Sequence, residues 1–159
     1  MAKTAVHLGI KLEAKGFFLD IAVSPETPRY FHGDPLLVEK IVHTLVRHSM
    51  KCLDNGGITI RINTLDFAAQ GNHRLVISIN ESSHGMMPEE VQSINQSLQQ
   101  EKGQDRDGTI SPHLRIAAQW IQSLGGHLTI ESVFGWGTRY LITLNLCVAG
   151  CDNSCLGAA

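Results

Sequence analysis

The residue best placed to do chemistry is Glu81, which ends an alternating apolar run in the stretch ISINESSHGM, residues 77–86. An apolar run that stops at an acid and a turn of small residues is typical of a strand that delivers the acid to a binding pocket. The carboxylate would accept a hydrogen bond from an amino group such as that of a purine. A solvated acid at a strand end is the competing interpretation, and the residues alone favour it.

Two further positions combine polar chemistry with a predicted helix. His48 shares the spacing of the apolar residues around it, so it points inward, where hydrogen-bonded packing is a simpler role than a switch or a metal ligand. Ser111, His113 and Arg115 lie at a helix start, which is suited to binding an anion. Capping of that helix by Ser111 explains the serine without any ligand.

The helices that carry these residues have clear start and stop signals. Asp34 as N-cap and Pro35 at the first helical position begin a helix whose apolar residues recur at helical spacing up to residue 52. Ser111 and Pro112 begin a second helix in the same way, and Gly125 ends it.

The strands follow from alternation and predict the fold class. Most runs have one apolar and one polar face, so helices should cover one side of the sheet only. We therefore expect an α+β fold, a two-layer sandwich with a mixed, mostly antiparallel sheet. The opening runs, 6–12 and 17–23, are interpreted as a hairpin, although the first could equally be the end of a helix. The other predicted strands are 58–64, 74–80, 127–133 and 138–146.

Length and composition indicate one domain. A chain of 159 residues with 43% hydrophobic residues can bury one substantial core. We expect the domain to cover residues 1–147, with a polar, lid-like excursion over 86–108, and residues 148–159 to form a flexible tail or linker. Cys147, Cys151 and Cys155 have a regular spacing, but no CxxC pair accompanies them, so we predict unliganded thiols and no metal site.

Charge and hydropathy exclude several partners. A formal net charge of -2 without a basic cluster gives little attraction to nucleic acid or anionic lipid. No run approaches the roughly 18 apolar residues of a membrane span. We expect a cytoplasmic location without direct membrane contact, either for the whole protein or for the cytosolic part of a membrane-anchored one.

The chain resembles, over nearly its whole length, the ATP-binding catalytic domain of sensor histidine kinases, whose Bergerat fold is shared with gyrase-type and Hsp90-type ATPases. Four segments in the same order carry the resemblance: HGDPLLVEKIVHTLVRHSMK, ISINESSHGMMPEE, HLRIAAQWIQSLGGHLTIES and FGWGTRYLITLNL. The resemblance implies a site for ATP and Mg²⁺, with functional residues at fixed positions.

Several of those positions depart from the family's pattern. His48 stands where an asparagine helps to hold Mg²⁺, and an imidazole is a poor partner for a hard, oxygen-preferring ion. Glu81 replaces the aspartate that accepts a hydrogen bond from adenine, and Ser83 replaces the first of two following glycines, of which Gly85 is kept. Where a glycine-rich loop cradles the phosphates, this chain has a serine cap and a proline within residues 109–113.

The free energy lost through these departures is large compared with the binding free energy of an ordinary nucleotide site. A missing charge-assisted hydrogen bond costs about 1.5 to 3 kcal/mol, and a non-glycine in a left-handed position costs roughly 1 to 2 kcal/mol. A nucleotide site of micromolar to millimolar affinity has only about 4 to 8 kcal/mol. We therefore predict a degenerate site without catalytic residues. Its vestigial nucleotide-binding set is His48, Lys51, Glu81, Ser83, Gly85, Ser111, His113 and Thr138.

The favoured function is a non-catalytic module of a two-component phosphorelay protein, without a cofactor, which docks or positions phosphotransfer or receiver domains. The alternative is a divergent, active histidine kinase domain that binds ATP and Mg²⁺, with Glu81 accepting the adenine amine. None of the eight histidines lies in an HExRxP-like phosphoacceptor context. Trp136 is interpreted as turn packing in preference to a docking anchor, and a homodimer stays open.

Overall fold

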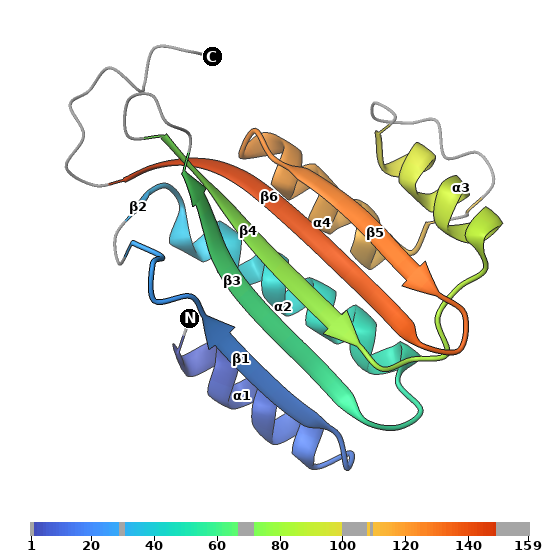
Figure 1. Cartoon of the computed structure of the whole chain (residues 1–159). Coiled ribbons are helices and arrows are strands. Elements are labelled where there is room, and N and C mark those ends of the chain that lie inside the picture. Colours follow the sequence, from blue (N-terminus) through green and yellow to red (C-terminus); the bar gives the residue numbers. More distant parts are fainter. Residues whose placement is uncertain (1, 29–30, 67–71, 100–107, 109, 149–159) are drawn as a thin grey trace.

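The computed structural model describes residues 2–28, 31–66, 72–99, 108 and 110–148, which form a layer of helices against one sheet (Figure 1). The elements along the chain are α1 (Ala2–Glu13), β1 (Phe18–Val23), β2 (Phe31–His32), α2 (Pro35–Cys52), β3 (Gly57–Asp66), β4 (Asn72–Glu81), α3 (Pro88–Gln99), α4 (Pro112–Ser123), β5 (His127–Val133) and β6 (Gly137–Val148).

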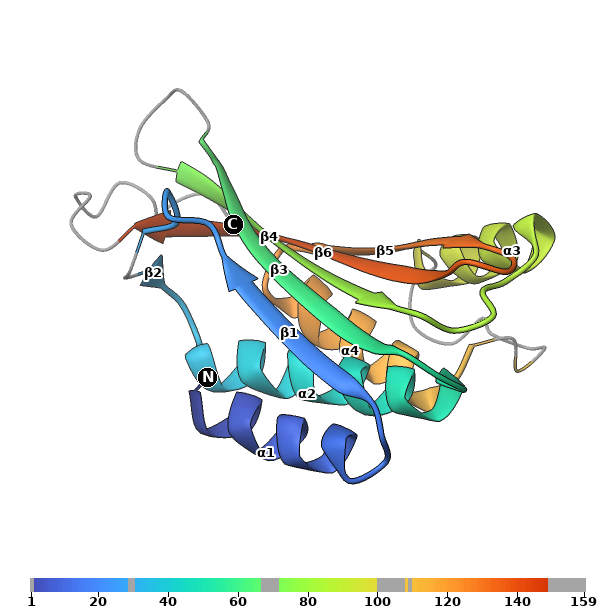
Figure 2. The ribbon, with the colours of Figure 1, turned by 60° about the horizontal axis from the view of Figure 1, so that its bottom comes forward.

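The sheet is mixed and mostly antiparallel. Its order is β1-β3-β4-β6-β2, and β5 pairs with the other part of β6. Only the pairing of β1 with β3 is parallel among the described strands. Helices α1, α2 and α4 lie on one face of the sheet, as Figure 2 shows. The predicted two-layer α+β fold is confirmed.

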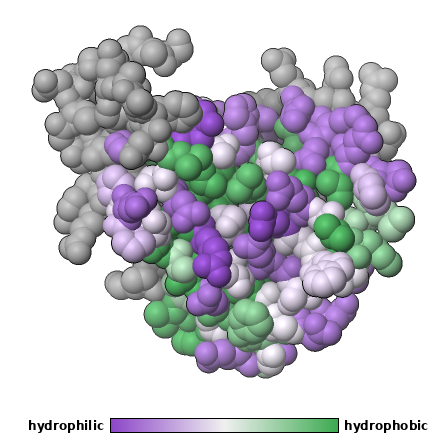
Figure 3. All heavy atoms as spheres, viewed as in Figure 1, coloured by the Kyte–Doolittle hydropathy of each residue, from purple (hydrophilic) through white to green (hydrophobic). Residues whose placement is uncertain are grey.

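The two faces of the sheet differ because side chains alternate along each strand. On β4, Ile77 and Ile79 are fully buried under the helices, and Glu81 has the same orientation. Asn80, which points the other way, accepts a hydrogen bond from Arg139 Nε over 2.8 Å. Figure 3 looks onto this open face, where hydrophilic side chains lie among apolar ones.

The predicted hairpin over residues 6–12 and 17–23 is wrong, and the helical alternative is correct for the first run. Leu8 and Leu12, four residues apart, are buried, whereas Val6 and Ile10 are 64% and 61% exposed. Apolar residues at every second position fit a strand, but here every fourth residue is buried, which is a helical pattern. β1 consequently pairs with β3 and not with the preceding segment.

The predicted helix caps are confirmed. Asp34 Oδ1 accepts a hydrogen bond from the Leu37 amide over 3.0 Å at the start of α2. Ser111 Oγ accepts one from the Leu114 amide over 3.3 Å at the start of α4. Gly125 follows α4 with a φ of 70°, the left-handed conformation expected of a helix stop.

Helix α3 is attached to the edge of β5 by side-chain hydrogen bonds. The Asn95 amide group donates to the Ile130 carbonyl over 2.7 Å and accepts from the Ile130 amide over 2.8 Å. Ile94 and Leu98 bury its apolar side. This helix occupies the first half of the segment predicted to be lid-like, and residues 100–107 lie outside the described part, so that role stays a prediction.

None of the helices in the described part of the chain combines the length and the apolar character that a membrane span requires. No group of three or more potential metal ligands was found in the same residues. Cys151, Cys155 and the rest of the predicted tail lie outside the described residues, as does the side chain of Cys147.

Candidate functional site

A cavity of about 210 Å³ lies between the end of β4 and the facing parts of α2, α3 and α4. The neighbouring strand β6 contributes Thr138 and Tyr140 to its wall. Its lining residues are His48, Cys52, Glu81, Ser83, His84, Gly85, Met86, Ile94, Ser111, Leu114, Thr138 and Tyr140. The cavity therefore lies where the sequence predicted the acid Glu81 and the helix start at Ser111.

Glu81 is the buried acid of this cavity, with a residue exposure of 5%. Ser83 Oγ donates a hydrogen bond to Glu81 Oε1 over 2.9 Å. Burial raises the pKa of the carboxyl, although nearby hydroxyls, those of Ser49, Ser83, Tyr140 and Thr138, favour its charged form. Oε2 has no hydrogen-bond partner among the described residues. The carboxylate is therefore buried from solvent, and one of its two oxygens lacks a hydrogen-bond partner in the described part of the chain.

His48 is joined to the start of α4. Its Nδ1 lies 3.2 Å from Ser111 Oγ. Because that hydroxyl oxygen already accepts the Leu114 amide, we assign its proton to a hydrogen bond to Nδ1. The imidazole also meets Tyr140 edge to face, with ring centroids 5.9 Å apart. Burial, with smaller effects of His113 and Lys51, lowers the pKa of His48 to about 4, so the ring is neutral at pH 7.

The first turn of α4 has few backbone donors left for an anion. Pro112 has no N–H, and the Leu114 amide is bonded to Ser111 Oγ. The Arg115 amide donates to the Ser111 carbonyl as the first helical bond. Within residues 112–115, only the His113 amide is not used by these bonds.

Six of the eight predicted site residues line the cavity: His48, Glu81, Ser83, Gly85, Ser111 and Thr138. Lys51 is exposed and does not line it. His113 is not a lining residue either, but its ring centroid is 6.3 Å from that of His48. Arg139 lies on the open face of the sheet, where its Nη1 contacts Glu131 Oε2 at 3.3 Å.

Sequence reasoning missed Ser49 and Tyr140, which are both buried beside Glu81. Ser49 follows Leu45 by four residues and so belongs to the inward side of α2, a signal that the pattern contained. Tyr140 alternates with Ile142 and Leu144, which also face the helices. In both cases a polar side chain occupies a position in an otherwise apolar stripe, and this pattern could have identified the residue as part of the site.

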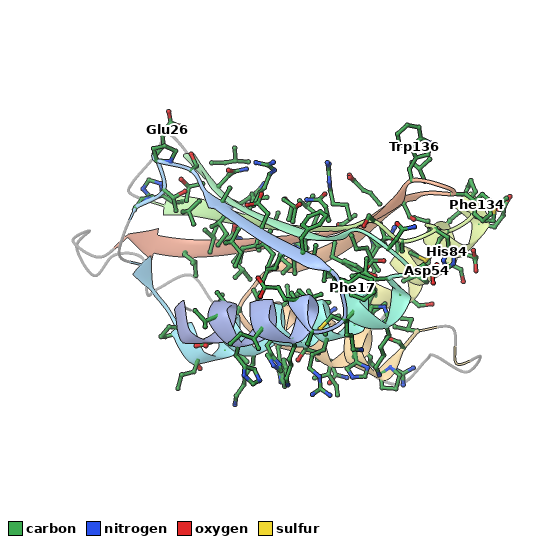
Figure 4. All side chains as sticks on the ribbon, turned by 90° about the horizontal axis from the view of Figure 1, so that it is seen from below. Phe17, Glu26, Asp54, His84, Phe134 and Trp136 are labelled. Atoms are coloured by element: carbon green, nitrogen blue, oxygen red, sulfur yellow. The ribbon has the colours of Figure 1, made fainter. Side chains whose placement is uncertain are left out.

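The turn between β5 and β6 projects three apolar side chains. Val133 and Phe134 are each 62% exposed, and Trp136 is 84% exposed. Figure 4 shows Trp136 standing clear of the sheet and Phe134 near one end of the molecule. Turn packing, the favoured interpretation of Trp136, is therefore wrong.

A family model described as histidine kinase-, DNA gyrase B- and HSP90-like ATPase matches residues 33–148. That range covers more than half of the chain and contains every residue of the cavity. The chain belongs to this family, which agrees with the α+β fold and with the position of the cavity.

Relatives with curated names come from signalling proteins. The chain is 29% identical over 145 residues to the sensor histidine kinase GacS of Pseudomonas protegens, covering 90% of this chain and 16% of that one. It is 25% identical over 118 residues to the phosphotransferase RcsD of Escherichia coli, covering 74% of this chain and 13% of that one. The chain thus spans about a sixth or less of these proteins.

A solved structure shares the fold. Full-length ShkA, crystallised in complex with AMPPNP, superposes with a TM-score of 0.68 at 18% identity, covering 93% of this chain and 29% of that one. The likeness shows the architecture, that of a histidine-kinase-type ATPase domain.

Proposed function

We propose that this chain is a pseudo-catalytic ATP-binding-fold domain of a two-component phosphorelay protein, which positions phosphotransfer or receiver partners and does not transfer phosphate from ATP. The observation that carries the proposal is the closed start of α4. Ser111 caps the helix and bonds to His48, and Pro112 removes a donor, where the family resemblance implies a phosphate cradle.

The residues present do not fit Mg²⁺ and a triphosphate. His48 offers a nitrogen in place of the expected asparagine oxygen, and its Nδ1 lies within hydrogen-bonding distance of Ser111. With only the His113 amide left over in the first turn of α4, a phosphate group would lack most of the donors that helix starts usually provide. Ser83 also uses one oxygen of the acid that would accept the adenine amine.

The size of the cavity supports the same proposal. About 210 Å³ is below the roughly 300–1,000 Å³ of ordinary small-molecule sites. Each lost charge-assisted hydrogen bond removes about 1.5–3 kcal/mol. One such loss at the metal position and one at the phosphate position together remove about 3–6 kcal/mol of the roughly 8 kcal/mol with which a micromolar nucleotide binds.

A docking role is supported by the exposed β5–β6 turn. Tryptophan and phenylalanine are both enriched at protein interfaces, and here they project from the turn of the β5–β6 hairpin. The similarity to proteins named as a sensor histidine kinase and as a phosphotransferase supports a role in a phosphorelay.

The rival proposal is a divergent kinase domain that still binds ATP. The observation in its favour is that Glu81 lines a cavity and leaves Oε2 without a partner, so an acceptor for an adenine amine persists.

Calorimetric titration with AMP-PNP, with and without Mg²⁺, separates the two proposals. A catalytically active sensor kinase domain serves as the positive control. We expect no binding tighter than about 100 μM, which corresponds to about -5.5 kcal/mol. Tighter, Mg²⁺-dependent binding would establish the rival.

A further inference from the structure

We propose that the cavity beside Glu81 binds a small organic cation, an amidinium or a protonated primary amine on a compact apolar group. The inference rests on the proposed function, because it gives the vestigial site a ligand other than a nucleotide.

The first argument is electrostatic. Glu81 is buried, and a buried carboxylate is stable only with a partner charge, hydrogen bonds or a proton. Of the other buried titratable residues in the lining, His48 is neutral, and burial raises the pKa of both Cys52 and Tyr140, which keeps them protonated. The exposed lining residue His84 faces an acid of its own, with Nδ1 3.7 Å from Asp54 Oδ2. Glu81 therefore has hydrogen bonds from hydroxyl groups but no partner charge among the described residues.

The nearby cations do not reach this acid. Lys51 on α2 is exposed and is not a lining residue. Arg139 lies on the opposite face of the sheet, bonded to Asn80 and Glu131. His113 on α4 is not a lining residue, and its ring centroid lies 6.3 Å from that of His48. An incoming cation would meet no competing positive charge from the lining residues.

The second argument is hydrogen bonding. Glu81 Oε1 is bonded to Ser83, but Oε2 has no partner within the described residues. The Ser49 hydroxyl is close enough to this carboxyl to favour its charged form. A carboxylate oxygen accepts an N–H of a planar amidinium well, because the positive charge strengthens the bond. A buried acceptor without a partner costs about 1–3 kcal/mol, so a ligand that satisfies Oε2 is favoured.

The third argument is the shape and polarity of the wall. Beyond the polar end, Met86, Ile94 and Leu114 line the cavity with apolar surface. A volume of about 210 Å³ suits a single small ring or a short alkyl group. An anionic ligand would be repelled by Glu81, and a neutral base would leave its charge uncompensated. A cation with a compact apolar body would pair with the carboxylate at the polar end of the cavity and contact the apolar wall at the other end.

The test uses benzamidine as the probe, titrated into the whole chain and followed by calorimetry and by NMR of the Glu81 carboxyl carbon. Benzamide has the same shape without the charge and is the neutral control. We expect benzamidine to bind with a dissociation constant of about 1 mM or lower, reasonable for so small a ligand. Benzamide and adenosine should bind at least tenfold more weakly.

Two variants locate the site. Glu81→Gln should weaken benzamidine binding at least tenfold, whereas Glu131→Gln, at an exposed acid of the open face, should leave it unchanged. Binding by the unmodified chain should also weaken as the pH falls through the raised pKa of Glu81, because a proton competes with the cation. That pH profile needs no variant, so it decides the matter even if Glu81→Gln fails to fold.

Equal binding of benzamide and benzamidine would overturn the inference, and so would undetectable benzamidine binding or an unaltered affinity in folded Glu81→Gln. None of these results affects the proposed function. Binding of AMP-PNP tighter than about 100 μM would overturn the proposed function, whatever benzamidine does.

Discussion

The two ends of the candidate site depart from the family's pattern to different extents. At the β4 end, Gly85 keeps the residue type that the resemblance implies, and Gly137 and Thr138 match the family's last glycine motif. The acid changes only in length there, and Ser83 replaces one glycine. At the α4 end, a capping serine and Pro112 stand in place of an open loop. The difference is explained by what each residue does for the fold.

Residues kept at the β4 end are also required for packing. A Cβ on Gly85 would collide with the Val133 carbonyl oxygen, and one on Gly137 would collide with that of Glu81. Thr138 Oγ1 lies 3.0 Å from Ser132 Oγ, which in turn accepts a hydrogen bond from the Met86 amide over 2.8 Å. These contacts join the β5–β6 hairpin to the loop after β4 without any ligand. Their retention is therefore no evidence for nucleotide binding.

The largest effect is expected at Gly85. Gly85→Ala should lower the free energy of unfolding by about 3 kcal/mol or more, since it combines a collision with backbone and a φ of 70°. Gly135→Ala is the matched control: φ is 84°, but nothing lies within 4 Å of the added Cβ, so only about 1–2 kcal/mol should be lost. Urea denaturation measures both. Equal losses would show that the close approach to Val133 is not needed for stability.

His48 gives the next largest effect, through pH. Its pKa is about 4 in the folded protein against an ordinary 6.5, so it stabilises the fold above pH 6.5, and this contribution is lost as the pH falls towards 4. Because the ring is partly exposed, we reduce the expected loss to about 1–2 kcal/mol. His48→Gln should flatten the stability profile between those pH values. His127→Gln, at an exposed histidine, should keep the slope of the unmodified chain in the same denaturation series.

The cap of α4 comes third. Ser111→Ala should cost about 1–2 kcal/mol, because it removes the acceptor of the Leu114 amide and the partner of His48 Nδ1. Asp34→Ala removes an exposed cap of α2 with a single bond, so about 1 kcal/mol is expected. Urea denaturation of the two variants compares them. A smaller loss for Ser111→Ala would show that the bond to His48 adds nothing.

Most of the fold was predictable because local signals and burial agree. The caps at Asp34 and Ser111, the alternation over β3 to β6 and the stop at Gly125 all specify the same elements. The opening run failed because Val6, Leu8, Ile10 and Leu12 satisfy a period of two while only every fourth residue is buried. Tertiary contact with β1 decides between the two patterns, and a local pattern does not contain that contact.

The site was predictable in its residues more than in its bonds. The position of Glu81 at a strand end predicted the pocket, yet its solvation did not follow, because burial depends on Ser49 and Tyr140 from other elements. The bond between His48 and Ser111 joins residues 63 positions apart. Trp136 was misjudged because a glycine turn gives no indication of whether neighbouring elements cover it.

The smallest effect on stability is expected at Trp136. With 84% of its surface exposed, Trp136→Ala should change the free energy of unfolding by less than about 0.5 kcal/mol. Trp120→Ala is the contrast, because that half-buried ring packs against the core and should cost about 2 kcal/mol or more. In the full-length protein, Trp136→Ala should instead slow phosphotransfer between domains, measured with radiolabelled phosphate. A stable variant with unaltered transfer would remove this turn from the docking surface. A loss of more than about 1 kcal/mol would show that Trp136 packs against its neighbours and stabilises the fold.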